Sequence, residues 1–175
     1  MLQKVRITDQ SSFSIKPLYI LIREVYKTSG FMSENFNEKF RSFTFFDNFL
    51  TNFEEIPGAF LLIAFVDDQP AGYISIEPKQ ASRLKHTAWL NMGVLEKHRG
   101  KGIGKMLIDE ALERIRDEKT IEIIYLMVRA DNFAAVKLYQ QKGFETLATL
   151  EKDTKIGTQY FDGILMRKFA SNMNS

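Results

Sequence analysis

Residues 92–107 read MGVLEKHRGKGIGKML and carry three glycines, at positions 100, 102 and 104, between an expected strand and an expected helix. Residues without a Cβ atom let the backbone turn tightly and let a ligand approach the main chain closely. The first amides of a helix point out of its N-terminus, and the helix dipole favours an anion there. Lys101 and Lys105 lie among these glycines. The stretch therefore predicts a cradle for phosphate groups.

Two well-known phosphate cradles do not fit this stretch. The Walker A motif needs Ser or Thr after its Gly-Lys pair, and here Met106 follows Gly104-Lys105. The Rossmann fingerprint G-x-G-x-x-G is not matched either, because the glycines here are spaced G-x-G-x-G. By itself the stretch thus indicates an anion at a helix N-terminus, or a glycine-rich turn without a ligand.

The hydrophobic pattern on both sides of this stretch predicts seven strands and four helices. The strands are expected at residues 4–8, 59–66, 71–76, 87–94, 121–128, 144–150 and 158–169. The helices are expected at residues 14–27, 34–52 and 102–117, and from a cap at Asp131 or Asn132 to Gly143. A turn is expected over residues 67–70. This order mixes antiparallel hairpins with one crossover, which is typical of an α+β or mixed α/β fold.

Composition narrows the class of protein. The chain has 175 residues, no cysteine and a net charge of +2, and no apolar run approaches the roughly 20 residues that cross a bilayer. Its first residues lack the apolar core of a secretory signal, so we expect a cytoplasmic protein without a membrane partner. Residues 78–108 hold seven Lys or Arg against one acid, which can attract a multiply charged anion or form a solvated face. No nucleic-acid motif accompanies them, and we expect no nucleic-acid partner.

Two segments together resemble a known family. Arg99-x-x-Gly102-x-Gly104, preceded by MGVL at residues 92–95, resembles the pyrophosphate-binding motif of the GNAT superfamily of acyl-CoA-dependent N-acetyltransferases. VRADNFAAVKLYQQKGF at residues 128–144 is similar to the later helix of that family, with Asn132, Tyr139 and a closing Gly-Phe pair. The resemblance runs in the family's order and spacing from about residue 59 to residue 168.

The resemblance implies a fold and a cosubstrate. It implies one N-acetyltransferase domain over residues 1–175, with residues 170–175 as a frayed tail, and a mostly antiparallel sheet in which the strands at 87–94 and 121–128 are parallel and splayed. The pantetheine arm of acetyl-CoA would lie between these two strands. The cofactor-binding residues so implied are Met92, Gly93, Val94, Arg99, Gly100, Lys101, Gly102, Ile103, Gly104, Lys105, Asn132 and Tyr139. With two histidines and no cysteine, no metal site is expected.

Catalysis needs an acid for the departing thiolate and, for a protonated amine, a base. Tyr139 lies two helical turns beyond Asn132 on the same face, and a phenol can protonate a thiolate, so Tyr139 is the expected general acid. Without the family motif, the same tyrosine would read as a core aromatic. Glu77, at the end of a strand that faces the expected cleft, is the expected general base, with His86 and Glu96 as weaker candidates.

The acceptor side of the site is less well marked. Phe36, Phe40 and Phe43 follow helical spacing and suit a core, whereas the adjacent Phe45 and Phe46 cannot share one face. Some of these rings could line a pocket, which favours an acceptor with an apolar part. Tyr160 and Asp162 could contact its amine or simply pack. We expect a small-molecule primary amine, such as an amino acid. The alternatives are a non-catalytic CoA-binding sensor and an enzyme that acetylates protein N-termini or lysines. Whether the chain forms a homodimer is left open.

Overall fold

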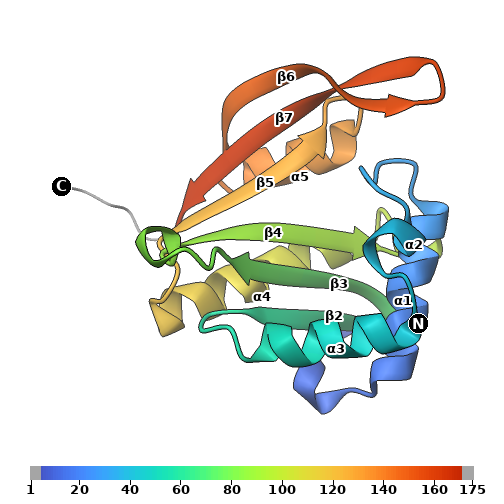
Figure 1. Ribbon diagram of the computed structural model, residues 1–175, viewed down its shortest axis with the longest axis vertical. Coiled ribbons are helices and arrows are strands. Elements are labelled where there is room, and N and C mark those ends of the chain that lie inside the picture. Colours follow the sequence, from blue (N-terminus) through green and yellow to red (C-terminus); the bar gives the residue numbers. More distant parts are fainter. Residues whose placement is uncertain (1–4, 171–175) are drawn as a thin grey trace.

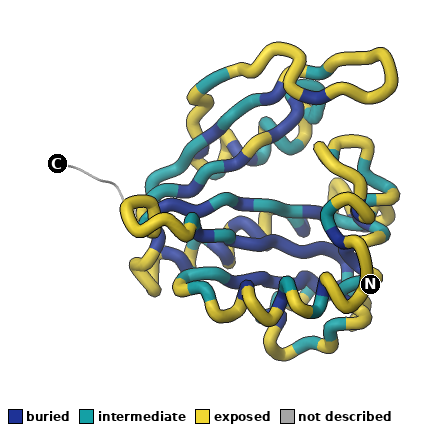
Figure 2. Tube along the Cα trace, viewed as in Figure 1, coloured by how far each residue is buried: buried dark blue, intermediate teal, exposed yellow. Residues whose placement is uncertain are grey.

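Strand β2 (Phe60–Val66) is buried along its whole length because both of its faces are covered. Phe60, Leu62 and Ala64 face one hydrophobic cluster, and Leu61 and Ile63 face a second one. This explains why the sequence reads as a continuous apolar run rather than an alternating one. Figure 2 shows β2 as a largely dark blue stretch in the lower half of the view.

The computed structural model describes residues 5–170, and these residues form a seven-stranded sheet in the order β1-β2-β3-β4-β5-β7-β6 (Figure 1). All neighbouring strands are antiparallel except β4 and β5, which are parallel. Besides β2, the strands are β1 (Val5–Asp9), β3 (Gln69–Pro78), β4 (Thr87–Val94), β5 (Ile123–Arg129), β6 (Glu145–Ile156) and β7 (Gln159–Phe169). The expected fold class is thereby confirmed. Lys4 and residues 171–175 of the expected tail lie outside the described residues.

Five α-helices occur in residues 5–170, one more than expected: α1 (Ile15–Thr28), α2 (Phe36–Lys39), α3 (Phe43–Glu54), α4 (Ile103–Glu118) and α5 (Phe133–Gln141). The single helix expected at 34–52 was wrong. Phe40 leaves the helical conformation (φ −125°, ψ 93°), and the Ser42 side chain accepts a hydrogen bond from the Phe45 amide and begins α3 anew. The apolar spacing hid this break because Phe36, Phe40 and Phe46 all pack into the same cluster. No helix in this range is long and apolar enough to span a membrane.

The turn between β2 and β3 is tighter than the expected four residues. Asp67 (φ 48°) and Asp68 (φ 61°) form a two-residue turn of the left-handed kind that matches hairpin twist. Gln69 and Pro70 already belong to β3, and Pro70 sits where the β2–β3 register shifts. The hairpin therefore starts two residues earlier than its sequence indicates.

The helices cover the two faces of the sheet unequally. α1, α2 and α3 pack on one face, and α4 and α5 cover the other, as the front and fainter rear helices of Figure 1 show. Leu107, Ile108 and Ala111 of α4 are fully buried against the sheet. The β6–β7 hairpin is mostly exposed (Figure 2). Strands β2 and β3 at the centre of the sheet are thus enclosed on both faces, whereas the parallel pair β4–β5 has partly exposed side chains on the face that carries α1 and α2.

Candidate functional site

The parallel strands β4 and β5 pair only at their beginnings. Their register covers Thr87–Trp89 against Ile123–Tyr125, and beyond these residues the strands diverge (Figure 1). β4 keeps its full pairing with β3 along the other edge. The expected splayed pair is therefore present, and it leaves a gap between the second halves of the two strands.

The main chain of β4 faces this gap. The Leu95 amide donates to the Ala71 carbonyl and the Lys79 amide donates to the Thr87 carbonyl, so odd-numbered residues of β4 bond to β3. Even-numbered residues consequently turn their N–H and C=O groups toward β5. Beyond the end of the β4–β5 ladder, these are the groups of Met92 and Val94. The Val94 carbonyl accepts a hydrogen bond from Arg99 Nε (3.1 Å).

The glycine loop follows directly from this edge. Gly100 (φ +73°) and Gly102 (φ +81°) have left-handed backbone conformations that L side chains rarely adopt, and an added Cβ atom at either would meet nothing within 4 Å. Gly102 is the N-cap of α4 and provides no side-chain cap, so the first amides of the helix face open space. This arrangement fits a pyrophosphate held by main-chain amides.

Other residues of the loop have different surroundings. Lys101 and Lys105 are exposed, whereas the Ile103 side chain is buried in the core, so only its main chain is available to a ligand. An added Cβ at Gly104 would lie 3.3 Å from Leu138 Cδ2, because α4 approaches α5 closely there. Arg99 Nη2 donates to the Thr28 carbonyl at 3.3 Å. Its guanidinium thus ties the loop to the end of α1.

Gly93 is required by packing. It is buried in β4 opposite Tyr73, and an added Cβ would lie 2.3 Å from Val25 Cγ1 and 3.0 Å from Tyr73 Cε1. Helix α1 could not approach the sheet this closely over any larger residue. Gly93 therefore brings α1, with Tyr26 next to Val25, against the end of β4.

The later helix α5 carries Asn132 at its start and Tyr139 in its last turn, and only Asn132 lines the cavities beside the gap. Asn132 caps α5 by accepting the Ala135 amide (3.3 Å), and it also lines a cavity beside the gap. Tyr139 is buried with its ring edge-on to Phe144. Burial raises the pKa of the Tyr139 phenol well above its usual value near 10. Tyr139 is thus held in the protonated form that can donate a proton.

Three adjoining cavities open beside the gap on the face that carries α1 and α2, and all three are lined by Lys39 and Asn91. We call them together the central cleft. They enclose about 370, 710 and 700 Å³ of space, open mouths included. The smallest is walled by apolar side chains: Ile22, Phe40, Phe46, Phe49, Leu50, Phe53 and Leu61. The cavity of about 710 Å³ reaches the gap at Met92, Val128 and Asn132.

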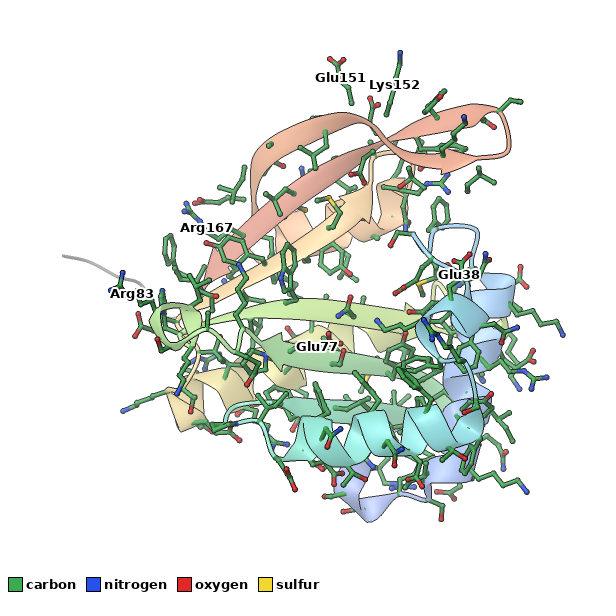
Figure 3. The ribbon with its side chains drawn as sticks, viewed as in Figure 1. Glu38, Glu77, Arg83, Glu151, Lys152 and Arg167 are labelled. Carbon is green, nitrogen blue, oxygen red and sulfur yellow. The ribbon has the colours of Figure 1, made fainter. Side chains whose placement is uncertain are left out.

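Glu77 lies within this cleft. It points from β3 on the sheet face that carries α2 and α3 (Figure 3), and Ser75 Oγ donates a hydrogen bond to its carboxylate at 2.8 Å. The weaker base candidates lie elsewhere: His86 lines a separate cavity before the start of β4, and Glu96 is exposed. Of the three proposed bases, only Glu77 lines the cleft.

Several polar residues of the cleft were not found by sequence reasoning: Tyr26, Glu34, Lys39, Tyr73, Asn91 and Arg129. Tyr73 shares the strand face of Glu77, and Asn91 is a polar residue inside an apolar strand, so strand alternation could have found both. Burial, with the nearby groups of Tyr26, Glu77 and Tyr139, raises the pKa of Tyr73 far above its usual value. Tyr73 lines two of the three cavities of the cleft.

The phenylalanines divide between core, cleft and surface. Phe36, Phe40 and Phe46 are buried, and the last two also wall the smallest cavity. Phe43 and Phe45 are exposed, so the core role expected for Phe43 was wrong. In the β6–β7 hairpin, Asp162 accepts the Lys152 amide (2.8 Å), and Tyr160 is half exposed beside Lys152 and Lys155. Among residues 5–170 no group of three His, Asp or Glu side chains is placed to hold a metal.

The sequence matches a family model. Residues 22–144 match the acetyltransferase (GNAT) family. The chain is 29% identical over 112 residues to an L-amino acid N-acetyltransferase, AaaT, of Escherichia coli K12, covering 64% of this chain and 69% of that protein. It is 29% identical over 102 residues to an N-alpha-acetyltransferase of Saccharolobus solfataricus, covering 54% and 61%. The chain thus spans about two thirds of the length of these relatives.

Solved structures share the fold. A GNAT-family acetyltransferase from Streptococcus pneumoniae superimposes with a TM-score of 0.85 at 24% identity, over 95% of this chain and 99% of that one. The yncA protein of Salmonella typhimurium, solved with its cofactor acetyl-CoA, superimposes with a TM-score of 0.79 at 16% identity, over 100% and 98%. The similarity extends over nearly the whole of both structures.

Proposed function

Because the chain belongs to the GNAT acetyltransferase family, we propose that it transfers an acetyl group from acetyl-CoA to the amine of a small acceptor that binds in the central cleft. The observation that carries the proposal is the β4–β5 gap, whose open edge presents main-chain groups of Met92 and Val94 beside the glycine loop. The loop amides and this edge form one continuous main-chain surface, which suits a phosphorylated, extended cosubstrate.

The residues that would hold acetyl-CoA fall into two sets. Main-chain amides from Arg99 to Lys105 would bind the pyrophosphate, with Lys101 and Lys105 adding positive charge. The edge at Met92, Gly93 and Val94 would hydrogen-bond the pantetheine arm as a missing strand would, and Asn132 would contact it from α5. When bound, acetyl-CoA supplies an acetyl group activated as a thioester. An amide at this edge is suited to stabilise negative charge on the thioester oxygen.

Two side chains would transfer protons in the reaction. Glu77 would accept a proton from the acceptor's ammonium, since its carboxylate lies in the cleft and is oriented by Ser75. Tyr139 would donate its phenolic proton to the departing sulfur. The raised pKa of Tyr139 keeps this proton in place at neutral pH, but it makes the phenol a weaker acid than an exposed tyrosine. No covalent bond between enzyme and acetyl group is needed.

We propose an amino-acid-like acceptor with an α-amine and an apolar part. An L-amino acid N-acetyltransferase and N-alpha-acetyltransferases are among the similar proteins, and both names refer to α-amines. The α-ammonium of a peptide N-terminus, with a pKa near 8, gives up its proton far more readily than a lysine ammonium near 10.4. The carboxylate of a free amino acid raises the pKa of its α-ammonium above that of an N-terminus, so this acceptor needs a base such as Glu77. Apolar side chains such as Ile22, Phe46 and Leu50 line one cavity of the cleft, which favours an acceptor with an apolar part.

A protein N-terminus is the second candidate acceptor. The names of the N-alpha-acetyltransferase relatives favour it. The narrow cavity walled by Phe40, Phe49 and Phe53 favours a small molecule instead, because a peptide needs an open groove for its following residues.

Release of CoA thiol tests the proposal. The purified chain would be incubated with acetyl-CoA and, in turn, amino acids, polyamines, aminoglycosides and short peptides. We expect acceptor-dependent thiol release, fastest with an aliphatic L-amino acid. Tight binding of acetyl-CoA with no release for any amine would instead identify a CoA-binding sensor.

A further inference from the structure

The basic side chain of Lys39 lies in the wall of the central cleft. It comes from the short helix α2, and its side chain lines all three cavities. One of these cavities reaches the gap at Met92, and another contains Glu77. The Lys39 side chain is 24% exposed, so its ammonium sits in the wall of the cleft rather than in free solvent.

The surroundings of Lys39 keep it charged. Its ammonium pairs with the Glu34 carboxylate at 3.5 Å and interacts with the Tyr26 hydroxyl. Burial lowers the pKa of Lys39, but Tyr26, Glu77 and Glu34 together outweigh burial, and the net pKa is raised. A lysine with a raised pKa cannot act as a general base at neutral pH. Its chemistry in the cleft is therefore that of a cation.

The Lys39 ammonium can still donate a hydrogen bond to a ligand. An ammonium group donates three hydrogen bonds, and within residues 5–170 Glu34 and Tyr26 account for two of them. The Glu34 side chain is 44% exposed, and such surface pairs are weak. A second anion could therefore join or replace Glu34 at little cost.

The other cation of the cleft is already engaged. Arg129 donates from Nε and Nη2 to the Asp131 carboxylate (3.0 and 2.6 Å) and from Nη1 to the Gly30 carbonyl (2.6 Å). The rings of Phe31 and Phe161 lie near its guanidinium, at 5.2 and 3.7 Å. The guanidinium of Arg129 is therefore occupied by contacts within the protein. Among the residues that line the cleft, Lys39 is the cation left to bind a ligand.

The charges of the cleft match a zwitterion. Glu77 offers a carboxylate to an ammonium group, and Lys39 offers an ammonium to a carboxylate. Both residues line the smallest, apolar cavity as well. A free α-amino acid carries both charged groups on its Cα atom, whereas a peptide N-terminus or an amino-acid amide has only the ammonium.

We propose that Lys39 binds the carboxylate of the acceptor and so selects free amino acids over peptide N-termini. This rests on the proposed function. Lys39 is a specificity-determining residue, and its contribution is to acceptor binding rather than to proton transfer.

The test compares L-leucine with L-leucinamide in the wild type, Lys39→Met and Lys39→Arg. The amide lacks the carboxylate and has a less basic amine, so kcat/KM is expressed per concentration of neutral amine. Lys39→Met keeps most of the side-chain stem but removes the charge. Lys27→Met is the matched control, because Lys27 also pairs with a glutamate, Glu24, but lies outside the cleft. We expect the wild type and the control to favour leucine roughly 10- to 100-fold in kcat/KM. Lys39→Met should lose this preference through a higher KM for leucine, and Lys39→Arg should retain part of it.

Binding of the reaction products provides an independent readout. N-acetyl-L-leucine and its amide would be titrated calorimetrically into the CoA-saturated protein, which requires no turnover. Tighter binding of the acid by wild type but not by Lys39→Met supports the proposal even if no acetylation is found, in which case only the proposed function fails. An equal preference in the wild type and Lys39→Met overturns the role of Lys39. So does a wild type that shows no preference between acid and amide, or that binds neither product.

Discussion

The two sides of the β4–β5 gap are built in different ways. The proposed cosubstrate side is mostly main chain, and most of it comes from one continuous segment, residues 92–105. The central cleft is made of side chains from separate elements: Tyr26 of α1, Lys39 of α2, Glu77 of β3, Asn91 of β4 and Arg129 of β5. A site made of main-chain groups needs glycines and small side chains that leave the backbone accessible. A site made of side chains needs particular side chains at particular positions. Substitutions should therefore affect the two sides in separable ways.

The largest expected effect is at Tyr139, the proposed general acid. Tyr139→Phe removes the proposed proton donor and should lower kcat by about 10²- to 10⁴-fold, with acetyl-CoA affinity nearly unchanged. Because its pKa is raised, the wild-type rate should show no loss from ionisation of Tyr139 up to pH 10. Steady-state kinetics and calorimetry measure both quantities. Tyr19→Phe, in a ring cluster of α1 and α3, is the control. An unchanged kcat would remove Tyr139 from the mechanism.

Gly102→Val should affect the main-chain side alone. A β-branched residue cannot easily keep φ at +81°, so the loop amides should move, and two lost hydrogen bonds to a charged group weaken acetyl-CoA binding by about 100-fold. Gly157→Val is a matched control, since Gly157 also has a positive φ (+60°) with open space around it, but lies in the turn of the β6–β7 hairpin. Equal affinities for both variants would contradict the cradle.

Glu77→Gln should affect the cleft alone, and the size of the effect reports on the amine. At pH 7 only a small fraction of a free amino acid's α-amine is neutral, because the adjacent carboxylate makes it more basic than a peptide N-terminus, so kcat/KM should fall by at least about tenfold and recover only at alkaline pH. Acetyl-CoA affinity should not change. Glu122→Gln, at an exposed position before β5, is the control. A rate profile identical to that of the wild type would exclude Glu77 as the base.

The smallest expected effect is at Gly93, where α1 packs closely against β4. Gly93→Ala should lower the free energy of unfolding by about 1–3 kcal/mol, because Val25 of α1 must move away from the added methyl group. Gly30→Ala, where an added Cβ meets nothing within 4 Å, should be close to neutral. Urea denaturation measures both. Similar stabilities would show that α1 is not held by close packing at Gly93.

The same difference explains what the sequence could predict. From the sequence, the glycines at 100, 102 and 104 indicated an anion-binding loop or a turn without a ligand, and Glu77 was expected from its place at the end of a strand. Lys39 and Tyr26 carried no such signal, because neither belongs to a local motif. They meet only because a break at Phe40 divides the expected helix and α1 packs against Gly93. The apolar spacing, which continues through that break, could not reveal it.

A crystal structure of the chain with acetyl-CoA tests the central claim most directly. We expect the pyrophosphate on the amides of residues 99–105 and the pantetheine arm between β4 and β5, hydrogen-bonded to the main chain of Met92 and Val94. The acetyl group should then face the central cleft near Tyr139. A cosubstrate bound outside the gap, or an acetyl group directed away from the cleft, would contradict the account.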